Sequence, residues 1–260
     1  MDPGLAAAGL GVGLLVGLTG MGAGSLMTPI LITVFGIPAS TAVGTDLVYA
    51  AITKAFGAAR HHQLKNVNRE LALWMATGSV PAAFAGTFTL YNVFGEDINS
   101  WLPDVIGITL VAVGIAVAIR TFVTIRGLWD ASKLPSDGPL TTRHKTMAVI
   151  IGVIFGFILG LTSVGSGVFF GMTLVTLFPL SARRVVGTDL LHAFLVTMAA
   201  GLGTVLFGVP NYGYVGTILI GSIPGILIGS HFTNMLPERA LRGSIAGVLA
   251  LSGMKLLGAF

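Results

Sequence analysis

The sequence contains no cysteine and few charged side chains. Only 9% of its 260 residues are Asp, Glu, Lys or Arg, against about 25% in a typical soluble domain. The absence of cysteine excludes disulfides, thiolate metal sites, Fe–S clusters and cysteine-based relays of sulfur compounds. So few charges cannot solvate the surface of a globule, whereas they suffice for the short loops of a helical membrane protein. A soluble enzyme and a disordered chain are therefore excluded.

Long basic runs are missing as well. The formal net charge is +4, but no basic run is longer than Arg183-Arg184, so the chain lacks the clustered basic face that binds nucleic acid. The start, Met1-Asp2-Pro3-Gly4, lacks the basic region of a cleaved signal peptide. We expect no nucleic-acid partner and interpret Met1 as the mature start.

Apolar residues and glycine take the place of charge. The chain is 54% apolar and has 37 glycines, and its mean hydropathy is +0.91. Apolar stretches lie at 5–22, 25–36, 41–59, 71–91, 104–125, 146–164, 168–178, 185–207, 214–233 and 243–260. All are predicted to be helices, because backbone polar groups in hydrocarbon must be satisfied within each segment. The sequence thus predicts an all-α polytopic membrane protein.

The chain repeats itself at an offset of 143 residues without a gap. Between positions 17 and 50, fifteen of 34 residues are identical to those of the second copy. The match includes Val43-Gly44-Thr45-Asp46-Leu47 and Val186-Gly187-Thr188-Asp189-Leu190. Chance similarity between apolar helices would not keep polar Thr-Asp pairs in register, so we interpret the chain as a duplicated half.

Two stretches, 25–36 and 168–178, are too short for a membrane crossing, which needs about 20 residues. Each follows a longer helix after a glycine tract, and we interpret each pair as a re-entrant helical hairpin with a glycine-rich tip. The predicted domains are repeat 1 at 1–125 and repeat 2 at 146–260, each with a hairpin and three spans, joined by a cytoplasmic linker at 126–145.

Three crossings per half predict that the second half is inverted relative to the first. With the linker inside, twelve of the fourteen cations lie at cytoplasmic ends, as the positive-inside rule requires. They are Arg60, Lys65, Arg69, Arg120, Arg126, Lys133, Arg143, Lys145, Arg183, Arg184, Arg239 and Arg242. The alternative of parallel halves places the last four outside. We expect inverted repeats in a multi-pass membrane protein whose N-terminus is outside.

Tips that enter from opposite faces are expected to meet near mid-membrane, where inverted-repeat carriers bind substrate. A helix N-terminus there offers unpaired N–H donors to an anion, and Ser25 is a good N-cap residue. The predicted substrate-binding residues are Thr19, Gly22, Gly24, Ser25, Thr45, Thr162, Gly165, Ser166, Gly167 and Thr188. The alternative for the glycines is close helix packing.

Asp46 and Asp189 are predicted to be coupling or ion-binding groups, because an ionised carboxylate inside a span costs about 2.5–3.5 kcal/mol. Tyr49 and His192 follow three residues later on the same helical face. The alternative is that each carboxylate caps its helix. Lys54 has no counterpart in the second half, and is expected either to attract an anion or to snorkel toward the inner surface near Arg60.

Three motifs carry a family resemblance: the tract Gly17-Leu18-Thr19-Gly20-Met21-Gly22-Ala23-Gly24-Ser25, the pair Gly44-Thr45, and Asn66-Val67-Asn68 after a basic turn. The whole chain resembles the TauE/SafE family of permeases, usually called sulfite exporters. The resemblance implies a bacterial or archaeal inner-membrane carrier for sulfite, sulfonates or related small anions. Asp46 and Asp189 depart from it, because the family often has neutral residues there.

We therefore expect a secondary transporter that works by alternating access and binds its anion between the two tips. The expected partners are a small sulfur anion, a coupling proton or sodium ion, and membrane lipid; a monomer and an oligomer both fit. A cation transporter or a channel built on Asp46 and Asp189 is the alternative. We expect no enzyme, no cofactor and no metal site, because no histidine lies near Ser25 and no metal-ligand spacing occurs.

Overall fold

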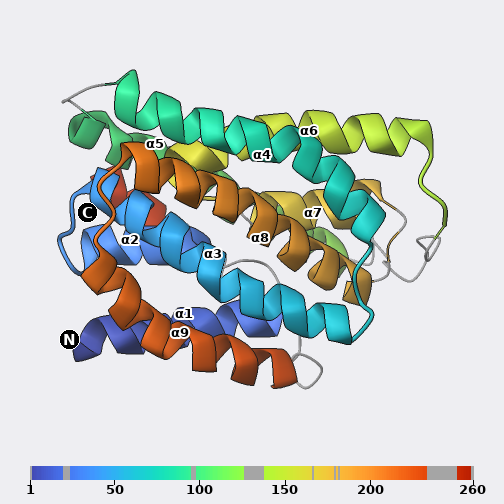
Figure 1. Ribbon diagram of the computed structural model, residues 1–260, viewed down its shortest axis with the longest axis horizontal. Coiled ribbons are helices and arrows are strands. Elements are labelled where there is room, and N and C mark those ends of the chain that lie inside the picture. The colour runs from blue at the N-terminus through green and yellow to red at the C-terminus, as the bar shows by residue number, and fades with distance from the viewer. Residues whose placement is uncertain are drawn as a thin grey trace.

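The computed structural model describes residues 2–19, 24–94, 98–125, 138–165, 167–178, 180, 182–232 and 251–258. All regular secondary structure within these residues is helical (Figure 1), which confirms the predicted all-α class. The labelled helices are α1 (Pro3–Thr19), α2 (Gly24–Thr33), α3 (Ala39–Gln63), α4 (Arg69–Asn92), α5 (Ile98–Ile125), α6 (Thr142–Thr162), α7 (Val168–Leu177), α8 (Ala182–Phe207) and α9 (Tyr212–Phe232), and residues 251–256 are also helical.

Polar side chains set the starts of two long helices. The side chain of Asn68 accepts a hydrogen bond from the backbone N–H of Leu71 at 3.0 Å and so caps α4. Thr141 and His144 form a reciprocal capping box at the start of α6. Such caps satisfy N–H groups that have no partner within the helix. Both helices therefore begin where the sequence changes from polar to apolar.

Five helices are long and apolar enough to cross a membrane by length and composition. They cover Arg69–Asn92, Ile98–Ile119, Thr142–Thr162, Arg184–Phe207 and Tyr212–His231. Large apolar side chains on these segments are exposed, including Ile108, Ile119, Ile154, Leu202 and Ile220. Exposed apolar surface of this extent requires a lipid environment rather than water. The chain is therefore a multi-pass membrane protein.

The helices expected to form hairpins differ from one another in length. α2 and α7 have 10 residues each, and at about 15 Å they are too short to cross. α6 has 21 residues and is apolar enough to cross by itself. The re-entrant hairpins thus stay a prediction, as does the division into two repeats and a linker, of which residues 126–137 lie outside the described residues.

The helices pack in pairs around a central pair. α3 packs on α8 in the middle of the molecule, α1 packs on α9 along one edge, and α4 packs on α6 along the opposite edge (Figure 1). α3 and α8 run antiparallel, because Gly44 lies against Thr204 whereas Gly57 lies against Leu190. The centre of the molecule is therefore lined by α3 and α8.

The two outer pairs have the same contacts at the 143-residue offset. Gly9 lies against the backbone of Ile218 in the α1–α9 pair, and Gly152 lies against the backbone of Met75 in the α4–α6 pair. The 143-residue offset relates Gly9 to Gly152 and Ile218 to Met75, so the two contacts are equivalent. A Cβ atom at Gly156 would lie 2.6 Å from the carbonyl oxygen of Ser79, so these glycines serve close helix packing.

Candidate functional site

Four buried polar residues lie on the two central helices, Asp46 and Lys54 on α3 and Asp189 and His192 on α8. Each has at most 2% of its surface exposed. α3 and α8 pack on each other and are flanked by α9 and α4, so these side chains face protein rather than lipid. We call these four residues the polar cluster. Buried ionisable residues inside a membrane protein mark a functional site by default.

Asp46 is held by two hydroxyl groups from other parts of the chain. Ser163, at the tip between α6 and α7, donates from Oγ to Oδ2 of Asp46 at 2.7 Å, and Thr28 of α2 donates to the same oxygen. Ser163 has a φ of 58° and ends α6 in the left-handed conformation. Oδ1 of Asp46 has no hydrogen-bond partner among the described residues. The carboxylate thus joins α2, α3 and the α6–α7 tip.

The interpretation of the two carboxylates as helix caps is wrong. α3 begins at Ala39 and α8 begins at Ala182, so Asp46 and Asp189 each lie seven residues beyond the helix start, about two turns inside. Backbone N–H groups at that depth are bonded within the helix. Both carboxylates therefore need partners other than the first turn of their own helix.

Asp189 has a different environment from Asp46. It is 1% exposed, and neither of its carboxylate oxygens has a hydrogen-bond partner in the described part of the chain. Lys54 lies within electrostatic reach of it. An ionised carboxyl group at this depth is costly without a counter-charge, and Lys54 is the counter-charge that the described part of the chain offers to Asp189.

Lys54 lies at the centre rather than at the membrane surface. Its side chain is 2% exposed and within electrostatic reach of both Asp46 and Asp189. Snorkelling toward Arg60 is therefore wrong. α3 continues to Gln63, so Lys54 lies more than two turns before the end of its helix. The carboxylates of Asp46 and Asp189 provide the counter-charge for its ammonium group.

His192 and Tyr49 are buried beside the carboxylates, as their spacing predicts. Nε2 of His192 lies 2.7 Å from Oγ of Ser79 on α4. The His192 ring packs edge to face on the ring of Phe170 of α7, with the ring centroids 4.3 Å apart. Nδ1 of His192 has no partner among the described residues. Tyr49 is 2% exposed. Their predicted role in ion coupling stays a prediction.

The two predicted threonines close matching turns at opposite ends of the central helix pair. Oγ1 of Thr45 accepts a hydrogen bond from the N–H of Asn211 at 3.1 Å, and Oγ1 of Thr188 accepts one from the N–H of Asn68 at 2.9 Å. The 143-residue offset relates Thr45 to Thr188 and Asn211 to Asn68, so the two hydrogen bonds are equivalent. Each hydroxyl therefore bonds a turn of the other half, and substrate binding by either stays a prediction.

The tip between α6 and α7 has the backbone conformation that its glycines allow. Gly165 and Gly167 have φ angles of 100° and 99°, a region that disfavours residues with a Cβ atom. Gly167 precedes α7 without a side-chain cap, and Thr162 hydrogen-bonds to backbone atoms of Ile158 and Val164. Gly22, Ser166 and the side chains of Thr19 and Ser25 lie outside the described residues, and Gly24 begins α2.

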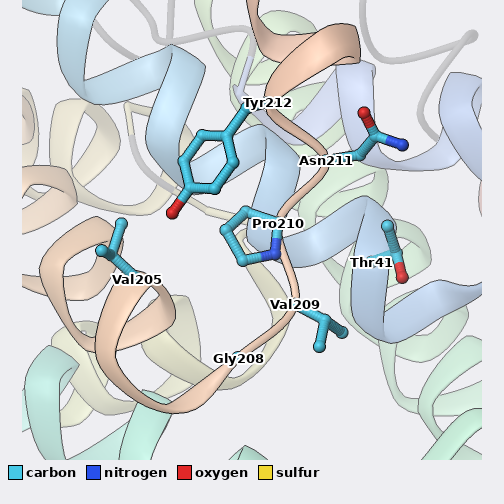
Figure 2. Close-up of a pocket in the computed structure, with 7 residues that line it drawn as sticks. All are labelled: Thr41, Val205, Gly208, Val209, Pro210, Asn211 and Tyr212. Carbon is cyan, nitrogen blue, oxygen red and sulfur yellow. The ribbon is translucent and has the colours of Figure 1, made fainter.

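A cavity of about 570 Å³ lies at the α8–α9 turn. Its lining residues are Thr41, Val205, Gly208, Val209, Pro210, Asn211 and Tyr212 (Figure 2). None of these residues is charged, and none belongs to the polar cluster. Thr41 lies one turn before Thr45, whose hydroxyl accepts from Asn211. The cavity therefore ends near the hydrogen bond that holds this turn to α3.

Sequence reasoning missed three residues of this site, namely Thr28, Ser163 and Ser79. Their hydroxyls reach the cluster from helices or turns distant in sequence, and Ser163 lies 117 positions from Asp46. No local pattern marks such a contact. A comparison of the halves does carry a signal, because positions 28 and 163 hold hydroxyls where positions 171 and 20 hold glycine.

Comparisons with known proteins agree with the membrane fold. The sequence model of the family described as sulfite exporter TauE/SafE matches residues 5–256. The Bacillus subtilis (strain 168) protein named probable membrane transporter protein YjnA is 42% identical over 253 residues, which cover 96% of this chain and 97% of that protein. Another protein of the same strain, probable membrane transporter protein YdhB, is 28% identical and covers 95% of this chain and 96% of its own length.

A more distant relative comes from an archaeon. Probable membrane transporter protein MJ0441 of Methanocaldococcus jannaschii is 26% identical, over 95% of this chain and 91% of that protein. No solved structure matches the chain at a significant level. The family match spans nearly the whole chain, and the relatives are named as transporters. The chain therefore belongs to the sulfite exporter TauE/SafE family, which is a family of membrane transporters and not of enzymes.

Proposed function

We propose that the protein is a secondary transporter that moves a small anion across the inner membrane by alternating access. The observation that carries this proposal is Lys54, a cation buried at the centre of the molecule with 2% of its surface exposed. A buried cation offsets the desolvation of an anion that leaves water. The family description favours sulfite, an organosulfonate or a related sulfur oxyanion as that anion.

The anion binds between the two tips, next to the polar cluster. Ser163 brings the α6–α7 tip to Asp46 at 2.7 Å, and Lys54 lies within electrostatic reach of Asp46. α7 starts at Val168 after Gly167, which provides no side-chain cap, and the N-terminus of a helix favours an anion. Thr19, Gly22, Gly24, Ser25 and Ser166 complete the proposed site from both tips.

The two halves have opposite orientations in the membrane, with the N-terminus outside. The charge distribution supports this proposal, because it gathers twelve of the fourteen Lys and Arg residues on one side. The antiparallel course of α3 and α8 also supports it, since these helices are related by the 143-residue offset. Repeats of this kind carry alternating access in many secondary transporters.

The bonds of Thr45 and Thr188 serve as the two gates. The Thr45–Asn211 bond holds the α8–α9 turn at the outer end, and the Thr188–Asn68 bond holds the α3–α4 turn at the inner end. The cavity at the α8–α9 turn is the outer vestibule. Breaking one bond at a time would expose the polar cluster to one side of the membrane.

A cation transporter or channel built on Asp46 and Asp189 is the second candidate. The observation that favours it is the excess of buried carboxylates, two against the one lysine of the polar cluster. A cation bound between the carboxylates would balance that charge. Saturable flux of an anion separates the proposed carrier from this alternative.

The test is uptake by purified protein in proteoliposomes. The substrate panel is sulfite, sulfate, thiosulfate, sulfoacetate and chloride against sodium and nickel, with and without a pH gradient. We expect saturable uptake of at least one sulfur anion, and a loss of about tenfold or more in Lys54→Gln, equivalent to about 1.4 kcal/mol. Uptake of sodium or nickel without any anion would overturn the proposal.

Lys145→Gln is the matched control. Lys145 lies near the start of α6, and its Nζ pairs with Oε1 of Glu70 at 2.8 Å. Its side chain is partly exposed, so the ion pair contributes about 0–1 kcal/mol. This variant removes the same charge from the protein surface and should transport within about twofold of wild type.

A further inference from the structure

The two carboxylates occupy equivalent positions in the two halves but have different partners. Two hydroxyls donate to Oδ2 of Asp46. The 143-residue offset places Gly171 and Gly20 at the equivalent positions for Asp189, and glycine has no hydroxyl to donate. Neither oxygen of Asp189 has a hydrogen-bond partner in the described part of the chain. The two positions equivalent to these donors thus carry no hydroxyl that could stabilise the second carboxylate.

The charges of the polar cluster do not balance when both carboxylates are ionised. Lys54 lies within electrostatic reach of both, and a single cation compensates only one of them. An uncompensated buried charge is strongly destabilising even after the protein relaxes. The hydroxyl donors favour the ionised form of Asp46. Neutralisation at Asp189 therefore costs less than neutralisation at Asp46.

We propose that Asp189 binds and releases the proton that is coupled to anion transport, whereas Asp46 stays ionised as a fixed anchor. This inference rests on the proposed function as an anion carrier. Protonated Asp189 leaves Lys54 and Asp46 as a neutral pair, so an anion beside Lys54 meets no uncompensated negative charge. Ionised Asp189 repels the same anion. Anion binding and proton binding are linked, and each strengthens the other by the same factor.

The other titratable groups around Asp189 do not take this role. α3 contributes Asp46, Tyr49 and Lys54, as well as the buried His61 in its basic last turn beside Arg60. α8 contributes Arg184 in its first turn and His192, whose Nε2 is engaged with Ser79. α7 has no titratable residue. The titratable side chains of α4 and α6 lie in their end turns, at Arg69, Glu70, Tyr91, Arg143, His144 and Lys145. Among the described groups facing the centre, Asp189 is the carboxyl group that lacks donors.

A proton fits this position better than a metal cation. Hard cations are coordinated by several oxygen ligands at once. At the two positions related by the 143-residue offset to Thr28 and Ser163, the sequence has glycine, which offers no side-chain oxygen to a metal cation. A proton needs only the carboxylate oxygen itself. The experiment below distinguishes a proton bound to Asp189 from a sodium ion bound to it.

The experiment is infrared spectroscopy of the purified protein in lipid, titrated over pH without any transport substrate. A protonated carboxyl group has a carbonyl stretch that an ionised one lacks. We expect one such band near neutral pH in wild type, and its loss in Asp189→Asn. In Asp46→Asn the band should persist but titrate at lower pH, because Lys54 then has Asp189 as its remaining carboxylate partner.

A band that survives Asp189→Asn, or a wild-type protein without such a band, would overturn the inference. Should Asp189→Asn fail to fold, Asp189→Glu keeps the carboxyl group and should shift the frequency of the band, whereas Asp46→Glu should leave it in place. A wild-type band that sodium removes at constant pH also overturns the assignment to a transported proton. Because no substrate is present, failure here is distinct from failure of the anion panel.

Discussion

Oγ of Ser163 lies 2.7 Å from Oδ2 of Asp46 and joins the α6–α7 tip to the central helix α3. Thr28 of α2 donates to the same oxygen. One carboxylate oxygen thereby holds three separate segments of the chain. Asp46 is a structural junction of the fold, and Asp189 at the equivalent position in the second half is not.

Removal of either hydroxyl at this junction should destabilise the protein. We expect Thr28→Val and Ser163→Ala each to lower the free energy of unfolding by about 1–3 kcal/mol, because a buried carboxylate loses a donor. The measurement is the thermal unfolding midpoint in detergent. Thr89→Val is the control, since the Thr89 hydroxyl donates to the carbonyl of Ala85 on an exposed face of α4. Equal unfolding midpoints for Thr28→Val and Thr89→Val would contradict the role of Asp46 as a structural junction.

The glycine contact between α1 and α9 gives a prediction within one helix. A Cβ atom at Gly13 would overlap the backbone of Ser222, whereas nothing lies within 4 Å of one at Gly11. Gly13→Ala should lower the free energy of unfolding by about 1–3 kcal/mol through overpacking. Gly11→Ala should be neutral or stabilising by up to about 1 kcal/mol, because alanine favours the helix. The reverse order of midpoints would show that the helices do not meet there.

The two threonine gates should open opposite ends of the protein. Loss of one hydrogen bond is worth about 1 kcal/mol, or about fivefold in population. Thr45→Val should therefore speed the labelling of a cysteine at Thr41, and Thr188→Val should speed the labelling of a cysteine at Arg184. Each reporter lies one turn before its gate and is half-buried. If each variant raises the labelling rates of both cysteines equally, the two hydrogen bonds stabilise the fold and do not act as gates.

The inverted orientation predicts which turns share a side. Single cysteines at Val93 and Val209, both exposed, should react with a membrane-impermeant reagent from outside intact cells, whereas one at Lys65 should not. The physical reason is that the first two turns carry no cation and the third is basic. The chain has no cysteine, so each label is unique. Labelling of Val93 and Val209 from opposite faces would establish parallel halves.

The helices and the burial of Asp46, Asp189 and His192 could be predicted from the sequence because their signals are local. Apolar stretches locate helices through the need to satisfy backbone groups, and α7 was expected at 168–178 and lies at Val168–Leu177. The burial of Asp46 and Asp189 follows from their place inside apolar segments. The repeated Thr-Asp pair identifies both positions as equivalent, which composition alone would not.

The partners of these carboxylates could not be predicted, because they depend on tertiary contacts. Ser163 reaches Asp46 across 117 positions. The capping alternative failed because α3 extends to Ala39, beyond the expected start at 41. Snorkelling of Lys54 failed because the sequence distance to Arg60 says nothing of the counter-charge, Asp189, that α8 brings within its electrostatic reach.

The central claim is that one anion and one proton move together through the polar cluster, with the proton on Asp189. Uptake of labelled sulfite and sulfoacetate by proteoliposomes, with an imposed pH gradient, tests it most directly. We predict that wild type accumulates at least one of these anions when the substrate side is more acidic. Asp189→Asn should exchange the same anion across the membrane but lose gradient-driven accumulation, since asparagine fixes the neutral state. Equal accumulation by wild type and Asp189→Asn would contradict the account.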